Sequence, residues 1–113
     1  MIKDSNITIN VADIDKSIAF YQSIGLTMKN RWGDHYAQFT APGITIGLHP
    51  TKVKLAENSG NVSIGFTADN FELVESTLSR LSIKTTAREE EGGKFLHFED
   101  PDGTELYFIK PKW

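Results

Sequence analysis

The stretch NITINV at residues 6–11 is repeated in outline by NVSIGF at residues 61–66. Both stretches alternate polar and apolar residues, which is the period of a half-buried β-strand. Each one leads through a short acidic segment into a helical pattern. Because the copies are 55 positions apart in a chain of 113 residues, the sequence predicts two tandem modules of similar build that share a surface.

The first module is predicted to run strand, helix and three strands. Its first strand occupies residues 5–11, and the helix that follows has Asp13 placed to cap it and Gly25 placed to end it. Turn signals at Gly33-Asp34 and Pro42-Gly43 then separate the remaining strands. These strands are expected at residues 26–32, 35–40 and 44–49.

The second module is predicted to repeat this order. After the strand at 61–66, apolar residues recur at helical spacing from Phe71 to Leu81. Further strands are expected at 83–88, 94–99 and 104–109, with a polar turn at 89–93. The segment Asp100-Pro101-Asp102-Gly103 is a strong turn signal, in which both aspartates are interpreted as turn formers.

These elements predict an α+β fold of two tandem β-α-β-β-β modules within one domain, residues 1–113. Module one spans about 5–49, a linker spans 50–60, and module two spans about 61–109. The length and the 39% hydrophobic and 24% charged residues are typical of a small soluble globular domain.

Composition also limits the partners. No apolar run approaches the roughly 18 residues of a membrane span, and a net charge of −3 argues against binding to a nucleic-acid backbone. The absence of cysteine excludes disulfides and thiol catalysis. The first residues lack the basic and apolar pattern of a secretory signal, so we expect a cytoplasmic protein that binds neither membrane nor nucleic acid.

Each predicted strand has an apolar face, which must pack under a helix, and a polar face. The polar faces either contact solvent, as in many antiparallel sheets, or line a cleft between two curved sheets. Candidate ligand-binding residues on these faces are Asn6, Gln38, His49, Asn61, His97, Glu105 and Tyr107.

Three segments, NITINVAD at 6–13, SIAFY at 17–21 and GL at 25–26, resemble the opening of proteins of the vicinal oxygen chelate superfamily. The segment FEDPDG at 98–103 is similar to the superfamily's other hallmark. This superfamily includes glyoxalase I, the extradiol dioxygenases, and the bleomycin- and fosfomycin-resistance proteins. The resemblance covers essentially the whole chain and implies paired β-α-β-β-β modules, curved sheets enclosing a cleft, and a homodimer.

In catalytic members, the resemblance implies, a metal in the cleft takes one ligand from the first and last strand of each module. Those positions correspond to Asn6, Gly47, Asn61 and Tyr107 in this sequence. Amide oxygens are weak neutral ligands, glycine has no side chain, and a phenol with a pKa of about 10 seldom ionises. We therefore expect no metal and no other cofactor, and a binding protein more than an enzyme.

An alternative hypothesis is a metal site displaced from the family's usual position. A shift of two residues leaves every side chain on the same face of its strand, and would bring His49 and Glu105 toward the cleft near His97. Two histidines and a glutamate satisfy an open metal site, as a lyase or dioxygenase of this superfamily would need. The same residues would otherwise be hydrogen-bonded parts of the wall, or act as metal-free acid–base groups.

A second group of candidates surrounds the predicted turn at Gly33-Asp34. Arg31, Trp32 and Tyr36, with His35 nearby, would form an aromatic and cationic mouth that stacks a flat or anionic ligand. Ordinary hairpin packing is the competing interpretation. The leading hypothesis is thus a protein that binds a small organic molecule in a metal-free cleft, with no catalytic residue assigned. A protein whose cleft is vestigial and whose dimer surface is functional remains a third alternative.

Overall fold

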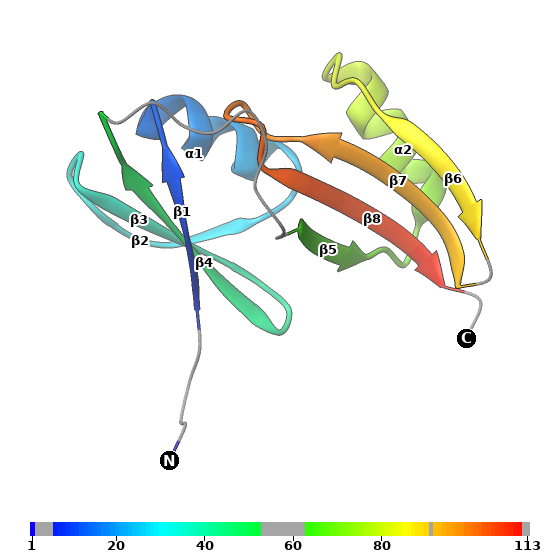
Figure 1. Ribbon diagram of the computed structural model, residues 1–113, viewed down its shortest axis with the longest axis horizontal. Coiled ribbons are helices and arrows are strands. Elements are labelled where there is room, and N and C mark those ends of the chain that lie inside the picture. The colour runs from blue at the N-terminus through cyan, green and yellow to red at the C-terminus, as the bar shows by residue number, and fades with distance from the viewer. Residues whose placement is uncertain (2–5, 53–62, 91, 112–113) are drawn as a thin grey trace. The chain divides into compact units, whose positions relative to one another are not determined.

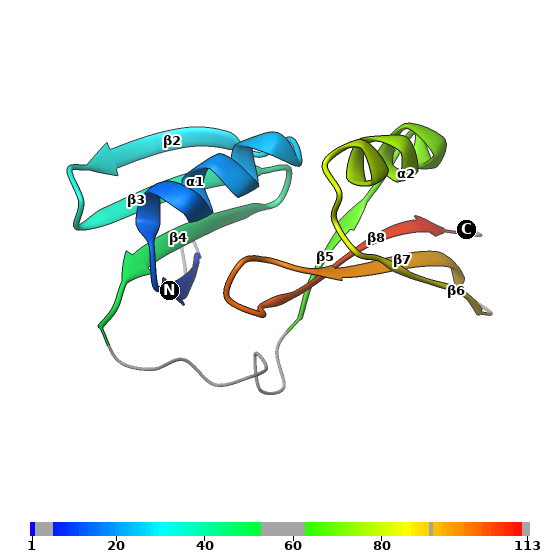
Figure 2. The same ribbon diagram turned by 90° about the horizontal axis from the view of Figure 1, so that it is seen from above.

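The computed structural model describes residues 1, 6–52, 63–90 and 92–111. The chain forms two compact units, Met1–Leu55 and Ala56–Trp113. Each unit is a four-stranded sheet with one helix packed on one of its faces (Figures 1 and 2). The boundary between the units lies inside the predicted linker, residues 50–60, while the assignment of both units to a single domain stays a prediction.

The first unit has the predicted order of strand, helix and three strands. Its sheet order is β1-β4-β3-β2, in which β1 is parallel to β4 and the other pairs are antiparallel. The sheet is therefore mixed, and its last strand lies between its first and third. The elements are β1 Ile7–Val11, α1 Ile14–Ser23, β2 Thr27–Trp32, β3 Tyr36–Ala41 and β4 Ile44–Pro50.

The second unit repeats this topology with the sheet order β5-β8-β7-β6. Its elements are β5 Ser63–Thr67, α2 Phe71–Arg80, β6 Thr86–Glu90, β7 Gly93–Glu99 and β8 Glu105–Pro111. Neither helix of the described residues is long and apolar enough to cross a membrane.

One predicted turn is wrong. Residues 89–93 were expected to form a polar turn, but Glu89 and Glu90 belong to β6 and Gly93 begins β7. Glu89 pairs with Lys94, and Glu90 pairs with Gly93. The reason is that β6 is an edge strand whose residues are all exposed, and an edge strand tolerates charged side chains that a buried strand would exclude.

The two helices begin and end in the same way. The carboxylate of Asp13 accepts from the Lys16 N–H at 3.1 Å, and the amide oxygen of Asn70 accepts from the Leu73 N–H at 3.1 Å. Both residues are N-caps, as predicted for Asp13. Because Asp13 and Asn70 are 57 positions apart, the structural repeat is 57 residues and not 55. Position 63, not Asn61, is thus the counterpart of Asn6; Asn61 itself lies outside the described residues.

The helix C-termini form matching Schellman motifs. The Leu26 N–H donates to the Tyr21 carbonyl at 3.0 Å, as the Ile83 N–H does to the Leu78 carbonyl at 3.0 Å. The residue in the left-handed conformation is Gly25 in the first motif, with φ 110°, and Ser82 in the second, with φ 58°. Among the described residues, Ser82 is the non-glycine residue with positive φ.

Each unit buries its own apolar core between helix and sheet. In the first unit Val11, Tyr21, Phe39, Ile46 and Leu48 are fully buried. The second unit buries Ile64, Phe71, Leu78, Leu96, Phe98, Leu106 and Ile109. The predicted apolar strand faces are therefore confirmed as the helix-covered faces.

The turn at residues 100–103 is confirmed and is built around one buried carboxylate. Asp100 is 5% exposed, and its Oδ1 accepts from the Asp102 N–H at 2.9 Å and from the Thr104 N–H at 2.8 Å. These two bonds satisfy the backbone N–H groups of Asp102 and Thr104 at the entry to β8.

We expect Ser82→Gly to stabilise the protein and Gly25→Ser to destabilise it. A left-handed residue other than glycine costs roughly 1 kcal/mol, part of which is offset by the freedom that glycine adds to the unfolded chain, so the expected gain is about 0.5 kcal/mol. At Gly25 the space around an added Cβ is open, so any loss there reports backbone strain alone. Urea denaturation of both variants is the measurement; the same sign for both changes would contradict the matched motifs.

Removal of the Asp100 side chain should cost about 1–3 kcal/mol, because two part-buried N–H groups lose their acceptor. Asp100→Asn retains an oxygen at the same position and should keep most of the stability of the wild type. Thermal melting of Asp100→Ala and Asp100→Asn tests this. Equal losses in the two variants would show that the charge, not the acceptor geometry, holds the turn.

Candidate functional site

The open face of the first sheet carries the predicted polar residues. In its middle row Gly47 on β4 has Thr8 of β1 on one side and Gln38 of β3 on the other. In the next row Asn10 pairs with His49, and Trp32 pairs with Tyr36. These side chains point away from the core residues, which alternate with them along the same strands.

The Tyr36 ring covers Gly47. A Cβ built on Gly47 would overlap the Tyr36 hydroxyl, so the absence of a side chain at position 47 provides the space for the ring. The ring reaches across β4 to β1, where the Tyr36 and Thr8 hydroxyls form a hydrogen bond at 3.2 Å. On its other side Tyr36 contacts Trp32, with ring centroids 5.6 Å apart and an angle of 35° between the rings.

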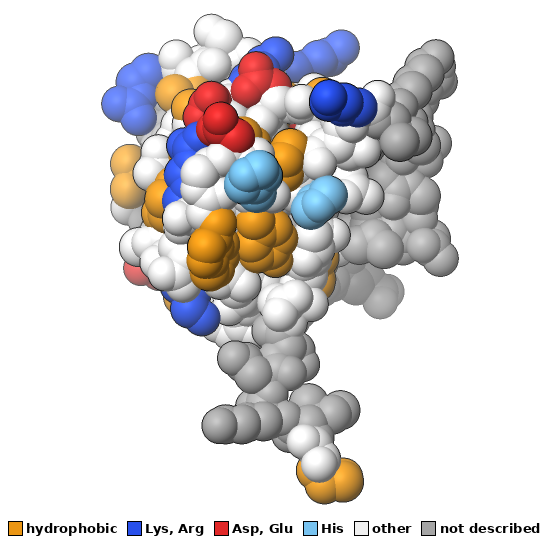
Figure 3. All heavy atoms as spheres, turned by 90° about the vertical axis from the view of Figure 1, so that its left-hand side faces the viewer, with side chains coloured by type: hydrophobic (Ala, Val, Ile, Leu, Met, Phe, Trp, Pro, Cys, Tyr) orange, Lys and Arg blue, Asp and Glu red, His pale blue; other side chains and the backbone are white. Residues whose placement is uncertain are grey.

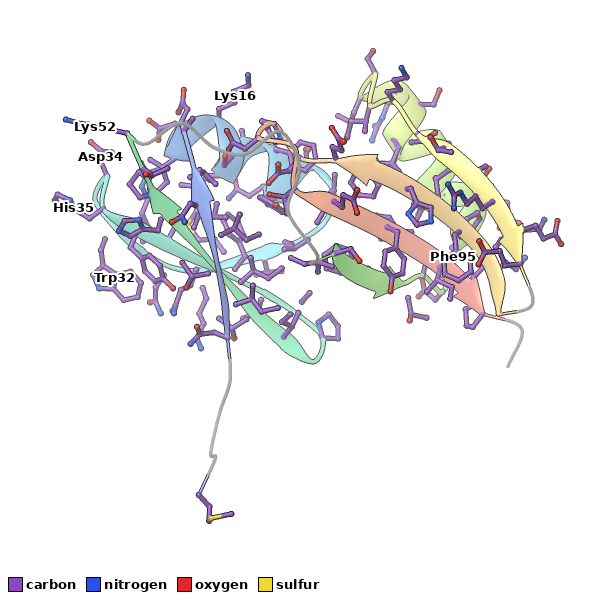
Figure 4. The ribbon with its side chains drawn as sticks, viewed as in Figure 1. Lys16, Trp32, Asp34, His35, Lys52 and Phe95 are labelled. Carbon is purple, nitrogen blue, oxygen red and sulfur yellow. The ribbon has the colours of Figure 1, made fainter. Side chains whose placement is uncertain are left out.

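Trp32 is 51% exposed although it packs on Tyr36. It lies next to the tip of the β2–β3 hairpin, beside Asp34 and His35 (Figure 4). Figure 3 shows hydrophobic side chains and histidines gathered on one side of the molecule. In the first unit His35 and His49 are both exposed. We call the two rings the Trp32–Tyr36 platform.

Arg31 lies on the opposite face of the same hairpin. It pairs with the buried Ala37, and its guanidinium donates to the Asp15 carboxylate of α1 at 2.7 Å, to the Asp34 carboxylate at 3.2 Å and to the Gly33 carbonyl at 2.8 Å. The hydrogen bond to Asp15, followed by the other interactions with the two carboxylates, raises the pKa of Arg31 above its ordinary value. The structure therefore separates Arg31 from Trp32 and Tyr36.

The open face of the second sheet carries a group of three rings. His97 pairs with Tyr107 across β7 and β8, and their ring centroids are 5.5 Å apart. Phe95 stacks on His97 at 6.0 Å and contacts Tyr107 at 5.8 Å; it is labelled on β7 in Figure 4. Tyr107 in turn covers Gly65 of β5, where an added Cβ would overlap its ring.

Phe95 was not among the predicted site residues. Its signal was present in the alternation of KFLHFE at residues 94–99, which places Phe95 on the same face as His97. Glu105, one of the predicted residues, is exposed on this face and pairs with Glu99 on one side and Ser63 on the other.

The structure thus brings the predicted residues together within each unit. Trp32, Tyr36, Gln38 and His49 share one face in the first unit, and His97, Glu105 and Tyr107 share one in the second. Asn6 is exposed and immediately precedes β1. His49 and His97 belong to different units, so the displaced metal set and the cleft between the sheets both stay predictions.

The residues at the positions that the resemblance assigns to a metal do not fit an ion. Asn6 immediately precedes β1, Gly47 lies on β4 and Tyr107 lies on β8. Ser63, the counterpart of Asn6 by the repeat of 57 residues, begins β5, while Asn61 lies outside the described residues. An amide, a glycine, a hydroxyl and a phenol do not match the imidazole and carboxylate ligands of divalent transition metals. The Tyr36 ring also fills the space above Gly47. Within the described ranges, His, Asp and Glu side chains form no group of three placed to hold a metal.

The duplicated units, each with a mixed four-stranded sheet and one covering helix, define a class of two-module α+β proteins. Residues 5–108 match the family model described as the Glyoxalase/Bleomycin resistance protein/Dioxygenase superfamily. The chain therefore belongs to this superfamily, as its sequence resemblance predicted.

Solved structures show the same fold. The fosfomycin resistance protein FosX from Listeria monocytogenes, complexed with Mn(II) and sulfate, is 22% identical, with a TM-score of 0.82 over 99% of this chain and 93% of that chain. A bleomycin-binding protein complexed with bleomycin is 17% identical, with a TM-score of 0.76 over 98% and 100%. A domain from Frankia sp. EAN1pec is 21% identical, with a TM-score of 0.77 over 99% of both chains. No curated protein matches the sequence.

Gly47→Ala is expected to push the Tyr36 ring off β4, break its hydrogen bond to Thr8 and cost about 1–3 kcal/mol by overpacking. In a Tyr36→Ala background the same change should cost much less, because the overlapping ring is gone. A double-mutant cycle in urea measures this coupling. Additive effects of the two changes would contradict the contact between Tyr36 and Gly47.

Proposed function

We propose that the protein binds a small organic molecule with a planar ring on the Trp32–Tyr36 platform, without a metal. The observation that carries the proposal is the half-exposed Trp32 ring held against Tyr36 on a face that is otherwise polar. A large aromatic side chain with half its surface in water would gain favourable free energy if that surface were buried. A flat ligand would complete that burial.

The polar groups next to the platform would orient such a ligand. Gln38 and His49 lie on the same face, and their side chains provide both donors and acceptors. A few directed polar groups beside an apolar surface are the usual composition of a small-molecule site. The bleomycin-bound relative shows that this fold accommodates an organic ligand, and that precedent supports the proposal.

The proposal extends to both units. Asn6, which immediately precedes β1, and His97, Glu105 and Tyr107 on the second sheet would add hydrogen bonds if the two open faces enclose a common cleft. Asn61, which lies outside the described residues, remains a candidate from the sequence alone. The ring group of Phe95, His97 and Tyr107 supports this, since it offers a second aromatic surface. A homodimer and a cytoplasmic location, both expected from the sequence, belong to the same proposal; sedimentation velocity tests the dimer.

A metal-dependent lyase or dioxygenase is the second candidate. It is favoured by the Mn(II) complex of FosX and by the position of Glu105 next to the His97–Tyr107 pair. It would require His49, His97 and Glu105 to converge on one ion.

Three probes with one ring system separate the binding proposal from its alternatives. Quinoline is neutral, 1-methylquinolinium is cationic and quinoline-2-carboxylate is anionic. We expect at least one to raise the melting temperature, since a ligand at about 100 times its Kd stabilises by about 2.7 kcal/mol. Trp32→Ala should weaken that binding by about ten-fold, the loss of roughly one ring-stacking contact.

Leu73→Ala is the matched control, because Leu73 is a large hydrophobic residue on α2 that is 60% exposed. It should leave probe affinity unchanged. Failure of all three probes, or equal losses in the Trp32 and Leu73 variants, would remove the platform from the site. Stoichiometric zinc, nickel, manganese or iron in the purified protein, with turnover of a glutathione hemithioacetal or a catechol, would establish the enzyme instead.

A further inference from the structure

We infer that Arg31 is a positioning residue, which fastens the tip of the β2–β3 hairpin to helix α1 and thereby holds Trp32 in place for its ligand. The inference rests on the proposed function of the platform, and it replaces the predicted role of Arg31 as a contact for an anionic ligand.

Arg31 joins three segments of the first unit. Its terminal nitrogen Nη2 reaches Asp15 in the first turn of α1 and Asp34 in the hairpin turn, while its Nε donates to the Gly33 carbonyl. A planar guanidinium can make such directed bonds at once, which a lysine ammonium on a flexible stem cannot reproduce with the same geometry. These bonds therefore connect the two sides of the hairpin turn and also connect the turn to helix α1.

These bonds enclose the backbone of Trp32. Arg31 and Gly33 are its two chain neighbours, and the bond from the Arg31 side chain to the Gly33 carbonyl spans it. Within the hairpin turn, the His35 N–H donates to the Trp32 carbonyl at 3.0 Å. A Trp32 ring that is 51% exposed has few packing neighbours of its own, so its orientation depends on this backbone restraint and on Tyr36.

The geometry disfavours direct ligand contact by Arg31. Neighbouring residues of a strand point to opposite faces, and Arg31 pairs with buried Ala37 while Trp32 pairs with Tyr36 on the open face. The guanidinium is already bound to two carboxylates. An anion bound by the guanidinium would compete with these carboxylates and would lie on the face away from the platform.

The expected effect is on binding more than on folding. Asp15 and Asp34 side chains are 73% and 85% exposed, and ion pairs in such positions contribute little to global stability. Without the restraint, the Trp32 ring must be ordered when the ligand binds. The entropic cost of that ordering weakens the affinity.

The test uses a Trp113→Phe background, in which Trp32 is the remaining one of the chain's two tryptophans. The variants are Arg31→Ala, Arg31→Lys, and the double change Asp15→Ala with Asp34→Ala, which removes both side-chain acceptors and keeps the arginine. Lys29→Ala is the matched control, since it removes a positive charge from an exposed residue of the same strand. Time-resolved fluorescence anisotropy of Trp32 without probe reports ring mobility, and titration with the three quinoline probes reports affinity.

Arg31→Ala and the double carboxylate variant should both increase Trp32 mobility and weaken every bound probe by a similar factor, about three- to ten-fold. The Trp32 mobility and probe affinity of Arg31→Lys should lie between those of these two variants and those of the background protein. Lys29→Ala should have the same mobility and affinity as the background protein. A loss confined to quinoline-2-carboxylate would show direct contact with an anion and overturn the inference, as would unchanged mobility in Arg31→Ala. If mobility rises but the background protein binds no probe, the restraint stands and the proposed function fails.

Discussion

The parallel pairing of the first and last strands within each unit determines which residues become neighbours on the open face of its sheet. Because β4 enters between β1 and β3, Gly47 becomes the neighbour of both Thr8 and Gln38, although the three residues come from separate parts of the chain. The same pairing of β5 with β8 sets Gly65 beside Tyr107. A parallel pair needs a long crossover, and the helix and the two-stranded hairpin of each unit supply it. The helix then covers one face of the sheet and leaves the other free.

On the face that the helix does not cover, each unit packs a tyrosine ring over a strand glycine. Tyr36 extends from β3 over Gly47 on β4, and Tyr107 extends from β8 over Gly65 on β5. Glycine weakens a strand because it offers no side chain to its neighbours, and the ring restores that contact. The result is an aromatic surface on each unit, which covers Gly47 in the first unit and includes Tyr107 in the second, two of the positions that the sequence resemblance assigned to metal ligands.

The β2–β3 hairpin shows how a bulge decides which face of the sheet neighbouring residues occupy. The pairing shifts between Met28 and Asn30, so that Lys29 has no partner on β3. Without the shift, simple alternation from Met28 would place Trp32 with the core and Arg31 on the open face. The bulge reverses this, sending Trp32 to the platform and Arg31 to the carboxylates of α1 and the turn. With structural relatives at 17–22% identity, such local differences, more than the shared fold, separate one function from another.

Much of the fold was readable from local signals. The strand–helix–strand order, the Asp13 cap, the glycine at position 25 and the turn at Asp100 each depend on neighbouring residues, whose chemistry acts over a few positions. The strand register was not readable, because alternation is satisfied equally by any shift of two residues. For this reason the sequence predicts a repeat of 55 residues where the structure has 57. The edge position of β6, the face of Arg31 and the contact of Tyr36 with Gly47 depend on strands distant in sequence. Those features exist only once the sheets have formed, and they decide which side chains share each open face.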